Sequence, residues 1–142
     1  MHNLFLDTNI IVDYLGNRAP FDKHANQLFD GFINNNFFGH TSIINLIHNH
    51  YQIRKNLSEI DARFVMDQIM DLLTISDIPK GVARNAIRNL YVKDFEDAVQ
   101  FELAISSGSD FFITRNLKDF PDSAPFVICD AETYLNKYRL KE

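Results

Sequence analysis

Three carboxylates stand where a strand ends or a helix begins in the expected fold. Asp7 directly follows the apolar run Leu4-Phe5-Leu6, and Asp94 and Asp97 lie three residues apart at the start of a predicted helix. A carboxylate at the end of a buried strand is costly unless it is hydrogen-bonded, paired or bound to a metal. Asp94 and Asp97 share one helix face with Glu96 close by, so these charges repel one another unless they share a cation. Carboxylate oxygens are the ligands that Mg²⁺ prefers, so the pattern favours a metal site.

The same acids also fit a purely structural role. Asp7 and Asp94 are good helix N-caps, and acids in the first turn of a helix are favoured by its dipole. Asp119 is equally a turn residue before Phe120. Both interpretations, metal ligands and structural caps, therefore stay open on the residue types alone.

Short apolar runs alternate with helical periods along the chain. Strands are predicted at 4–6, 37–41, 73–78, 111–113 and 126–128, and helices at 9–15, 25–33, 42–55, 58–72, after 79, 94–108 and 130–138. This alternation predicts a single α/β domain over residues 1–142, a three-layer α/β/α sandwich with a mainly parallel central sheet. Ligands bind beyond the carboxyl ends of the strands in such sheets, which points to residues 7–9 and 114–116.

Composition narrows the class of protein. The 142 residues carry 14 Lys and Arg against 19 Asp and Glu, a formal net charge of −5. Cys129 is the only cysteine, which excludes a disulfide framework or a cysteine-based zinc site and favours a reducing compartment. No signal peptide or membrane span is recognisable, so we expect a cytoplasmic protein. The acidic balance does not exclude a nucleic-acid enzyme, because a bound cation reverses the local charge.

Four segments, in this order, resemble PIN domains, and in particular small bacterial PIN-like proteins related to VapC-type toxins. They are Leu6-Asp7-Thr8-Asn9, Arg18-Ala19-Pro20-Phe21, Asp94-Phe95-Glu96-Asp97-Ala98, and Thr114-Arg115-Asn116 with Asp119-Phe120. The likeness spans nearly the whole chain. It implies an α/β/α sandwich with a central parallel sheet and Mg²⁺- or Mn²⁺-dependent cleavage of RNA.

The resemblance also implies roles for individual residues. Asp7 and Asp97 match metal-binding acids, and Asp94 is an accessory acid one turn earlier. Thr8 and Thr114 match small polar residues that line the site. Asn9, which follows Thr8, joins this supporting set, and Asp119 is the nearest acid after the second motif strand.

Two positions depart from the family pattern. Where many members carry a Glu on the helix after the second strand, this chain has His48, or Asn45 if the alignment shifts by three residues. Where many have a second acid after the late strand, this chain has Asn116. A second ion near Asp94 and Asp119 should therefore bind weakly. Because imidazole suits Mn²⁺ better than Mg²⁺, we predict a stronger response to Mn²⁺ if His48 is a ligand.

His48 has a simpler interpretation as a solvated or hydrogen-bonded residue. It lies on the expected polar side of its helix, whose apolar side is predicted at Ile44, Ile47 and Tyr51.

The resemblance to PIN domains implies a homodimer, and a patch of Phe37, Phe38 and Tyr51 is one candidate interface. The same aromatics fit equally well in the core.

Basic residues suggest where RNA would bind. Arg115, next to the expected site, is the first candidate for a phosphate contact. Lys80, Arg84 and Arg88 recur every fourth residue as a stripe opposite Ala83, Ile87 and Leu90, which also fits an ordinary solvated helix face.

These features favour a metal-dependent endoribonuclease, with the toxin of a toxin–antitoxin pair as one form of it and a small antitoxin as its partner. The alternative is a non-catalytic PIN-like module that binds RNA or protein and has a degraded metal site. A phosphatase with Asp7 as nucleophile is disfavoured, because such an enzyme would need an acid where Asn9 stands.

Overall fold

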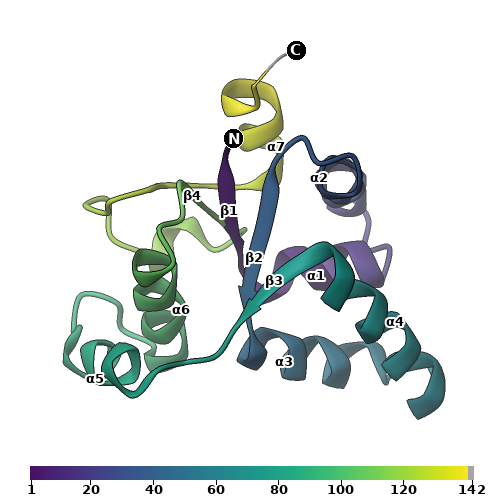
Figure 1. The fold of residues 1–142 in the computed structure, drawn as a ribbon, viewed down its shortest axis with the longest axis horizontal. Coiled ribbons are helices and arrows are strands. Elements are labelled where there is room, and N and C mark those ends of the chain that lie inside the picture. Colours follow the sequence, from purple (N-terminus) through teal and green to yellow (C-terminus); the bar gives the residue numbers. More distant parts are fainter. Residues whose placement is uncertain (141–142) are drawn as a thin grey trace.

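The computed structural model describes residues 1–140. Its sheet has five strands, β1 (Asn3–Leu6), β2 (Phe38–Ser42), β3 (Leu73–Ser76), β4 (Phe111–Ile113) and β5 (Val127–Cys129), in the order β3-β2-β1-β4-β5. Every neighbouring pair is parallel, with Leu4 of β1 opposite both Gly39 and Phe111 (Figure 1). The predicted parallel α/β sandwich is confirmed. Because β1 lies at the centre, the residue after its last strand position faces neighbours on both sides.

Helices connect the strands. They are α1 (Thr8–Leu15), α2 (Asp22–Ile33), α3 (Ile43–Ile53), α4 (Glu59–Leu72), α5 (Lys80–Arg88), α6 (Phe95–Ser106) and α7 (Ala131–Thr133). A 3₁₀ turn covers Leu117–Asp119, and the last predicted helix divides into α7 and a π-helical turn over Tyr134–Tyr138. Within residues 1–140, no helix is long and apolar enough to cross a lipid bilayer.

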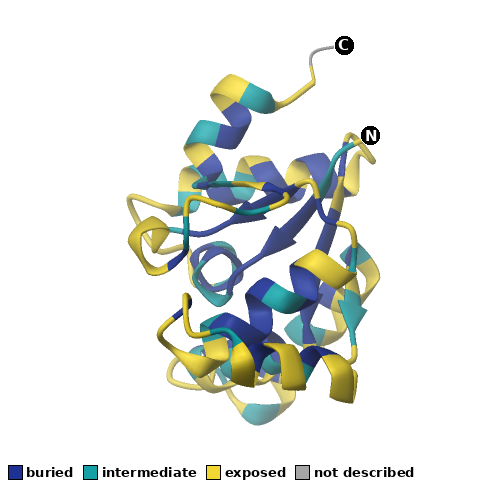
Figure 2. Cartoon of the chain, turned by 90° about the vertical axis from the view of Figure 1, so that its left-hand side faces the viewer, coloured by how far each residue is buried: buried dark blue, intermediate teal, exposed yellow. Residues whose placement is uncertain are grey.

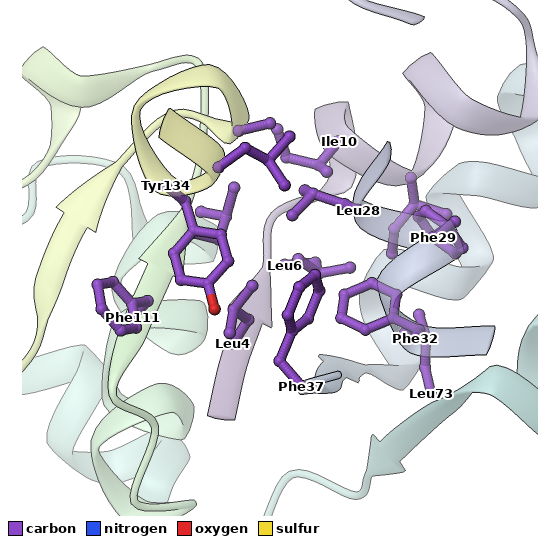
Figure 3. Packing of buried hydrophobic residues seen from close by; sticks show 14 of the residues in the cluster. Leu4, Leu6, Ile10, Leu28, Phe29, Phe32, Phe37, Leu73, Phe111 and Tyr134 are labelled. Atoms are coloured by element: carbon purple, nitrogen blue, oxygen red, sulfur yellow. The ribbon is translucent and has the colours of Figure 1, made fainter. Parts of the chain in front are cut away.

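Alternate residues of the central strands build two cores, one on each face of the sheet. Leu4 and Leu6 pack with Phe29, Phe32 and Tyr134 on the side of α1, α2 and α7 (Figure 3). On the opposite face, Phe5 and Phe112 pack with residues of α5 and α6. Figure 2 shows the strands buried between these layers and the outer helix surfaces exposed. The alternation is the ordinary consequence of the two-residue period of a strand.

Helix α3 presents the opposite face from the one predicted. Asn45 and Asn49 are fully buried, whereas Ile47 is 61% exposed and Tyr51 is 69% exposed. The prediction of an apolar buried side at Ile47 and Tyr51 is therefore wrong. The Asn45 and Asn49 amides bond to the backbone carbonyls of Leu6 and Thr8, so the helix turns its polar side toward the carboxyl end of β1. Buried carbonyls need donors, and that demand outweighs burial of two apolar side chains.

The proposed surface patch of three aromatics is not present as one surface. Phe37 is buried and packs edge-to-face against Phe32 and Tyr134. Phe38 remains half exposed on the neighbouring position. Successive strand residues point to opposite sides, so adjacent aromatics at the start of β2 separate into core and surface. Phe37 therefore completes the core, and homodimer formation stays a prediction without this patch.

Candidate active site

Asp7 is held rigidly at the carboxyl end of β1. Its carboxylate is buried and accepts two hydrogen bonds, from the Thr8 backbone N–H at 2.7 Å and from the Thr114 hydroxyl at 2.8 Å. Its own backbone N–H donates to the carbonyl of Ile113 in β4 at 3.0 Å. Burial raises the pKa of Asp7, while the hydrogen bonds from Thr114 and Thr8 oppose that shift. Asp7 caps α1 and also follows the last residue of the central strand, so the structural cap and the candidate metal ligand are the same residue.

A buried polar network supports Asp7 from behind. The Thr8 hydroxyl donates to Asn45 Oδ1 at 2.6 Å. Asn45 Nδ2 lies within hydrogen-bond distance of Thr41 Oγ1 and of Gln100 Oε1, at 2.9 Å and 3.1 Å. Asn45 therefore links the ends of β1 and β2 to α6. Of the two positions considered for the family's Glu, Asn45 is the one bonded to the residue after Asp7.

The acids of α6 form the second half of the site. Asp94 caps the helix by accepting a hydrogen bond from the Asp97 backbone N–H at 3.0 Å. Burial raises the pKa of Asp97 to about 7, and the charges of Asp7, Asp94, Asp119 and Glu96 push it in the same direction. Charges that shift one another's pKa lie within mutual reach. The fold therefore brings together acids from the end of β1, from α6 and from the 3₁₀ turn.

This acidic region opens into a cleft. Its volume is about 500 Å³, and it is lined by Tyr91, Lys93, Asp94, Asp97, Lys118, Asp119, Phe120 and Pro121. Asp97 and Asp119 both line it, although they are 22 positions apart in the sequence. We call this hollow the acidic cleft.

The donor set suits a hard divalent cation. The side chains whose charges act on Asp97 are all carboxylates. Burial is the largest cause of the raised pKa of Asp97, and a bound cation would relieve the charge repulsion that adds to it. Within residues 1–140, no three His, Cys, Asp or Glu side chains lie closely enough to hold a metal between them. Mg²⁺ is often held by only one or two protein carboxylates with waters, so a site for it does not require three.

The two family departures lie in different surroundings. His48 Nδ1 lies 2.8 Å from Glu96 Oε1, and both side chains are partly exposed. Asn116 donates its backbone N–H to the Thr114 hydroxyl at 3.0 Å. The threonine that fixes Asp7 is thus itself fixed by the following loop. His48 is thus paired with an acid of α6.

Arg115 is engaged inside the protein. Its guanidinium binds both carboxylate oxygens of buried Asp13, at 2.8 Å and 3.1 Å, and lies 4.0 Å over the ring of Phe21. The backbone N–H of Arg115 donates to Asn9 Oδ1 at 3.3 Å. Arg115 lines a separate cavity of about 250 Å³ together with Asn116. Its charge therefore serves first to neutralise Asp13, which favours a positioning role for the β4 loop.

The basic stripe of α5 does not line the acidic cleft. Lys80, Arg84 and Arg88 are exposed on the outer surface of α5. The helix buries Val82 and Ala86, whereas Ile87 and Leu90 are exposed. The predicted apolar side of this helix is therefore wrong, and the stripe keeps its solvated-face interpretation alongside the RNA-binding one.

Sequence reasoning missed the aromatic and basic residues of the acidic cleft. Tyr91, Lys93 and Lys118 line it, although none was singled out. A signal was available, because a lysine immediately precedes an acid of the cleft twice, in Lys93-Asp94 and in Lys118-Asp119.

Comparison with known proteins agrees with this fold. A family model described as PIN domain matches residues 3–118. The chain belongs to the PIN domain family. None of the curated protein sequences matches it.

Solved structures of similar fold come from bacterial toxin–antitoxin systems. The VapC20 toxin of Mycobacterium tuberculosis, described as cleaving the sarcin-ricin loop, is 15% identical with a TM-score of 0.64, over 86% of this chain and 99% of that one. A toxin–antitoxin complex from Klebsiella pneumoniae is 22% identical with a TM-score of 0.64, over 88% and 99%. VapBC-1 of nontypeable Haemophilus influenzae is 16% identical with a TM-score of 0.68, over 92% and 98%. At these identities the likeness is one of fold.

Proposed function

We propose that this PIN domain is a metal-dependent endoribonuclease that hydrolyses RNA phosphodiester bonds in the acidic cleft. The observation that carries the proposal is the convergence of carboxylates, because Asp94, Asp97 and Asp119 line one cleft. Burial, together with the charges of these acids and of Asp7, raises the pKa of Asp97 to about 7. Structural caps alone do not require acids of β1, α6 and the 3₁₀ turn to approach one another. A site for a divalent cation does.

Asp7 and Asp97 would hold the principal Mg²⁺ or Mn²⁺, and Asp94 and Asp119 would hold a weaker second one. When bound, such a cation supplies an activated water and offsets charge on the phosphoryl oxygens. Thr114 and the Thr8 N–H keep Asp7 oriented by direct hydrogen bonds. Asn45 and Asn9 hold the two loops that carry these donors.

A small antitoxin is the proposed protein partner, and the toxin of such a pair is the proposed biological form. Support comes from fold neighbours that were solved as toxin–antitoxin complexes, among them VapBC-1 of Haemophilus influenzae. A further neighbour is VapBC of Salmonella typhimurium, described as bound to DNA. RNA as substrate, a homodimer and a cytoplasmic location belong to the same proposal.

A cleavage assay tests the enzyme directly. A labelled RNA with single-stranded and hairpin regions is incubated with the purified protein in Mg²⁺, in Mn²⁺ and in EDTA. Asp7→Asn and Asp97→Asn variants, purified identically, remove one proposed ligand each. Asp71→Asn, an exposed acid on α4, is the matched control.

We expect cleavage that needs metal, persists in Asp71→Asn and is lost in both site variants. Cleavage that survives in Asp7→Asn and Asp97→Asn would identify a contaminant and contradict the proposal. Because His48 is paired with Glu96, the predicted preference for Mn²⁺ is tested separately from the need for metal. Equal cleavage in Mg²⁺ and Mn²⁺ would count against His48 as a metal ligand. If no condition gives cleavage and no metal binds, the non-catalytic module becomes the better description.

A further inference from the structure

An exposed tyrosine stands at the rim of the acidic cleft. Tyr91 is 88% exposed, although it lies between Leu90 and the buried Val92. It lines the same hollow as Asp94, Asp97 and Asp119. Val92 packs in the core, whereas the ring of Tyr91 lies in water beside the candidate site. Core packing therefore does not explain this large exposed aromatic side chain.

The segment that carries Tyr91 is fixed. The Asn89 side chain accepts a hydrogen bond from the Tyr91 backbone N–H at 3.1 Å and donates to Glu102 of α6, also at 3.1 Å. Val92 anchors the next position in the core on the α6 side of the sheet. The backbone of Tyr91 therefore has a defined position relative to the first turn of α6, where the candidate metal ligands lie.

Two lysines share the hollow and are not neutralised there. Lys93 and Lys118 line the acidic cleft beside three carboxylates. Within residues 1–140, neither ammonium group lies within ion-pair distance of a carboxylate. Cations that flank an acidic hollow without pairing with its acids are suited to an anion that enters from outside, such as a phosphate.

We infer that Tyr91 is a stacking platform for one unpaired base of the substrate, and that Lys93 and Lys118 contact the phosphates on either side of the acidic cleft. The inference rests on the proposed nuclease function and adds the residues of this chain that would contact a single-stranded segment of RNA. Aromatic side chains stack only on bases that are free of a helix, while lysines read the backbone without regard to sequence. Tyr91 is therefore a specificity determinant for strandedness, acting beside the catalytic acids.

Binding separates this role from catalysis. Fluorescence anisotropy is measured with a labelled single-stranded oligonucleotide of uridines and with a blunt RNA duplex of the same length. The protein carries Asp97→Asn throughout, so that no RNA is hydrolysed. In this background we compare Tyr91→Ala, Tyr91→Phe, Lys93→Ala and Lys118→Ala.

The controls are an exposed aromatic and an exposed lysine distant from the cleft. Phe64→Ala removes a ring that is 65% exposed on α4, and Lys137→Ala removes a cation near the carboxyl terminus. Tyr91→Ala should weaken single-strand binding about tenfold and leave duplex binding unchanged. Tyr91→Phe should retain it, because a phenyl ring also stacks. Lys93→Ala and Lys118→Ala should each lower the slope of log K against log salt by about 0.7.

The inference fails if Tyr91→Ala binds single strands as Phe64→Ala does, if the lysine variants keep the salt slope of Lys137→Ala, or if no single strand binds at all. Its failure is distinguishable from failure of the nuclease. Cleavage that depends on Asp97 but not on Tyr91 leaves the enzyme and removes the platform. Binding that depends on Tyr91, in a protein that cleaves nothing, leaves the platform and removes the enzyme.

Discussion

Asp97 lies in the first turn of α6 with Asp7, Asp94, Asp119 and Glu96 in electrostatic reach. Only Asp94 gives it a local structural partner, through the N-cap hydrogen bond to the Asp97 backbone. Burial is the largest cause of the raised pKa of the Asp97 carboxyl, and the charges of these neighbours add to it. Ionising it in the folded protein is therefore harder than ionising it in the unfolded chain, and this difference makes stability depend on pH.

We predict that the metal-free protein loses stability as pH rises from about 4 to about 7. In that range folded Asp97, with its pKa raised from 3.8 to about 7, holds a proton that the unfolded chain has released. Thermal unfolding in EDTA between pH 4.5 and 8.5 measures the effect. Asp97→Asn should melt close to wild type at the acidic end and above wild type at pH 8. A difference in Tm that does not change with pH would contradict this account.

At this scale the sequence predicted where the acids lie in the fold, at the end of β1 and at the start of α6, while their role as metal ligands stays a prediction. Asp7 after an apolar run, and Asp94 and Asp97 in one helix turn, are local patterns with local physical reasons. The choice between Asn45 and His48 was not predictable, because it depends on how α3 rotates against β1. The internal pairing of Arg115 was equally hidden, since its partner Asp13 lies 102 residues away.

At the scale of elements, α3 shows how the site shapes the fold. The side-chain N–H groups of Asn45 lie within hydrogen-bond distance of the Leu6 carbonyl, Thr41 Oγ1 and Gln100 Oε1. The first turn of this helix is therefore held by hydrogen bonds. Its apolar residues Ile47 and Tyr51 are the exposed ones. Periodicity reports which residues share a face, but it does not report which face meets the sheet.

Asn45→Ala should therefore destabilise the protein by about 2 kcal/mol, because it leaves the buried Gln100 Oε1 without its donor and the Thr8 hydroxyl without its acceptor. Ile47→Ala on the same helix should change the free energy of unfolding by less than about 0.5 kcal/mol, as surface substitutions usually do. Urea denaturation of the two variants measures both. A larger cost for Ile47→Ala than for Asn45→Ala would show that the apolar face is the one in contact.

A second element-scale prediction concerns two helical glycines. A Cβ on Gly31 of α2 would overlap the ring of Phe37, whereas a Cβ on Gly81 of α5 would meet nothing within 4 Å. Gly31→Ala should cost about 2 kcal/mol, because the packed core must shift. Gly81→Ala should gain about 0.5 kcal/mol from helix propensity. Equal effects in urea denaturation would contradict the packing of α2 on Phe37.

The strands and most helix boundaries were predictable from the sequence. Ser58 caps α4 with a hydrogen bond from the Asp61 N–H, as its spacing indicated. The division of the last helix was not predictable, because the π-helical turn carries Tyr134, which packs against Phe37 and Phe111. Tertiary packing determines such a turn, and local helix propensity does not predict it.

At the scale of the whole molecule, the strand order assembles the site. β1 lies between β2 and β4, so Asp7 meets Thr114, 107 residues away, and the support of Asn45 after β2. Helix α6 then lies on one face of the sheet with its first turn toward the same end (Figure 1). The net charge of −5 is thus partly a local feature, with carboxylates from distant segments gathered around one cleft. A bound cation would offset this local concentration of negative charge.

Calorimetric titration of Mn²⁺ into the protein near pH 7.5 tests this central claim most directly. We predict saturable binding by the wild type and by the Asp71→Asn control. Asp7→Asn and Asp97→Asn should each lose at least about tenfold in affinity, since even residues that only orient a metal ligand contribute that much. No binding by the wild type, or equal binding by all four proteins, would contradict the account of these carboxylates as a cation site.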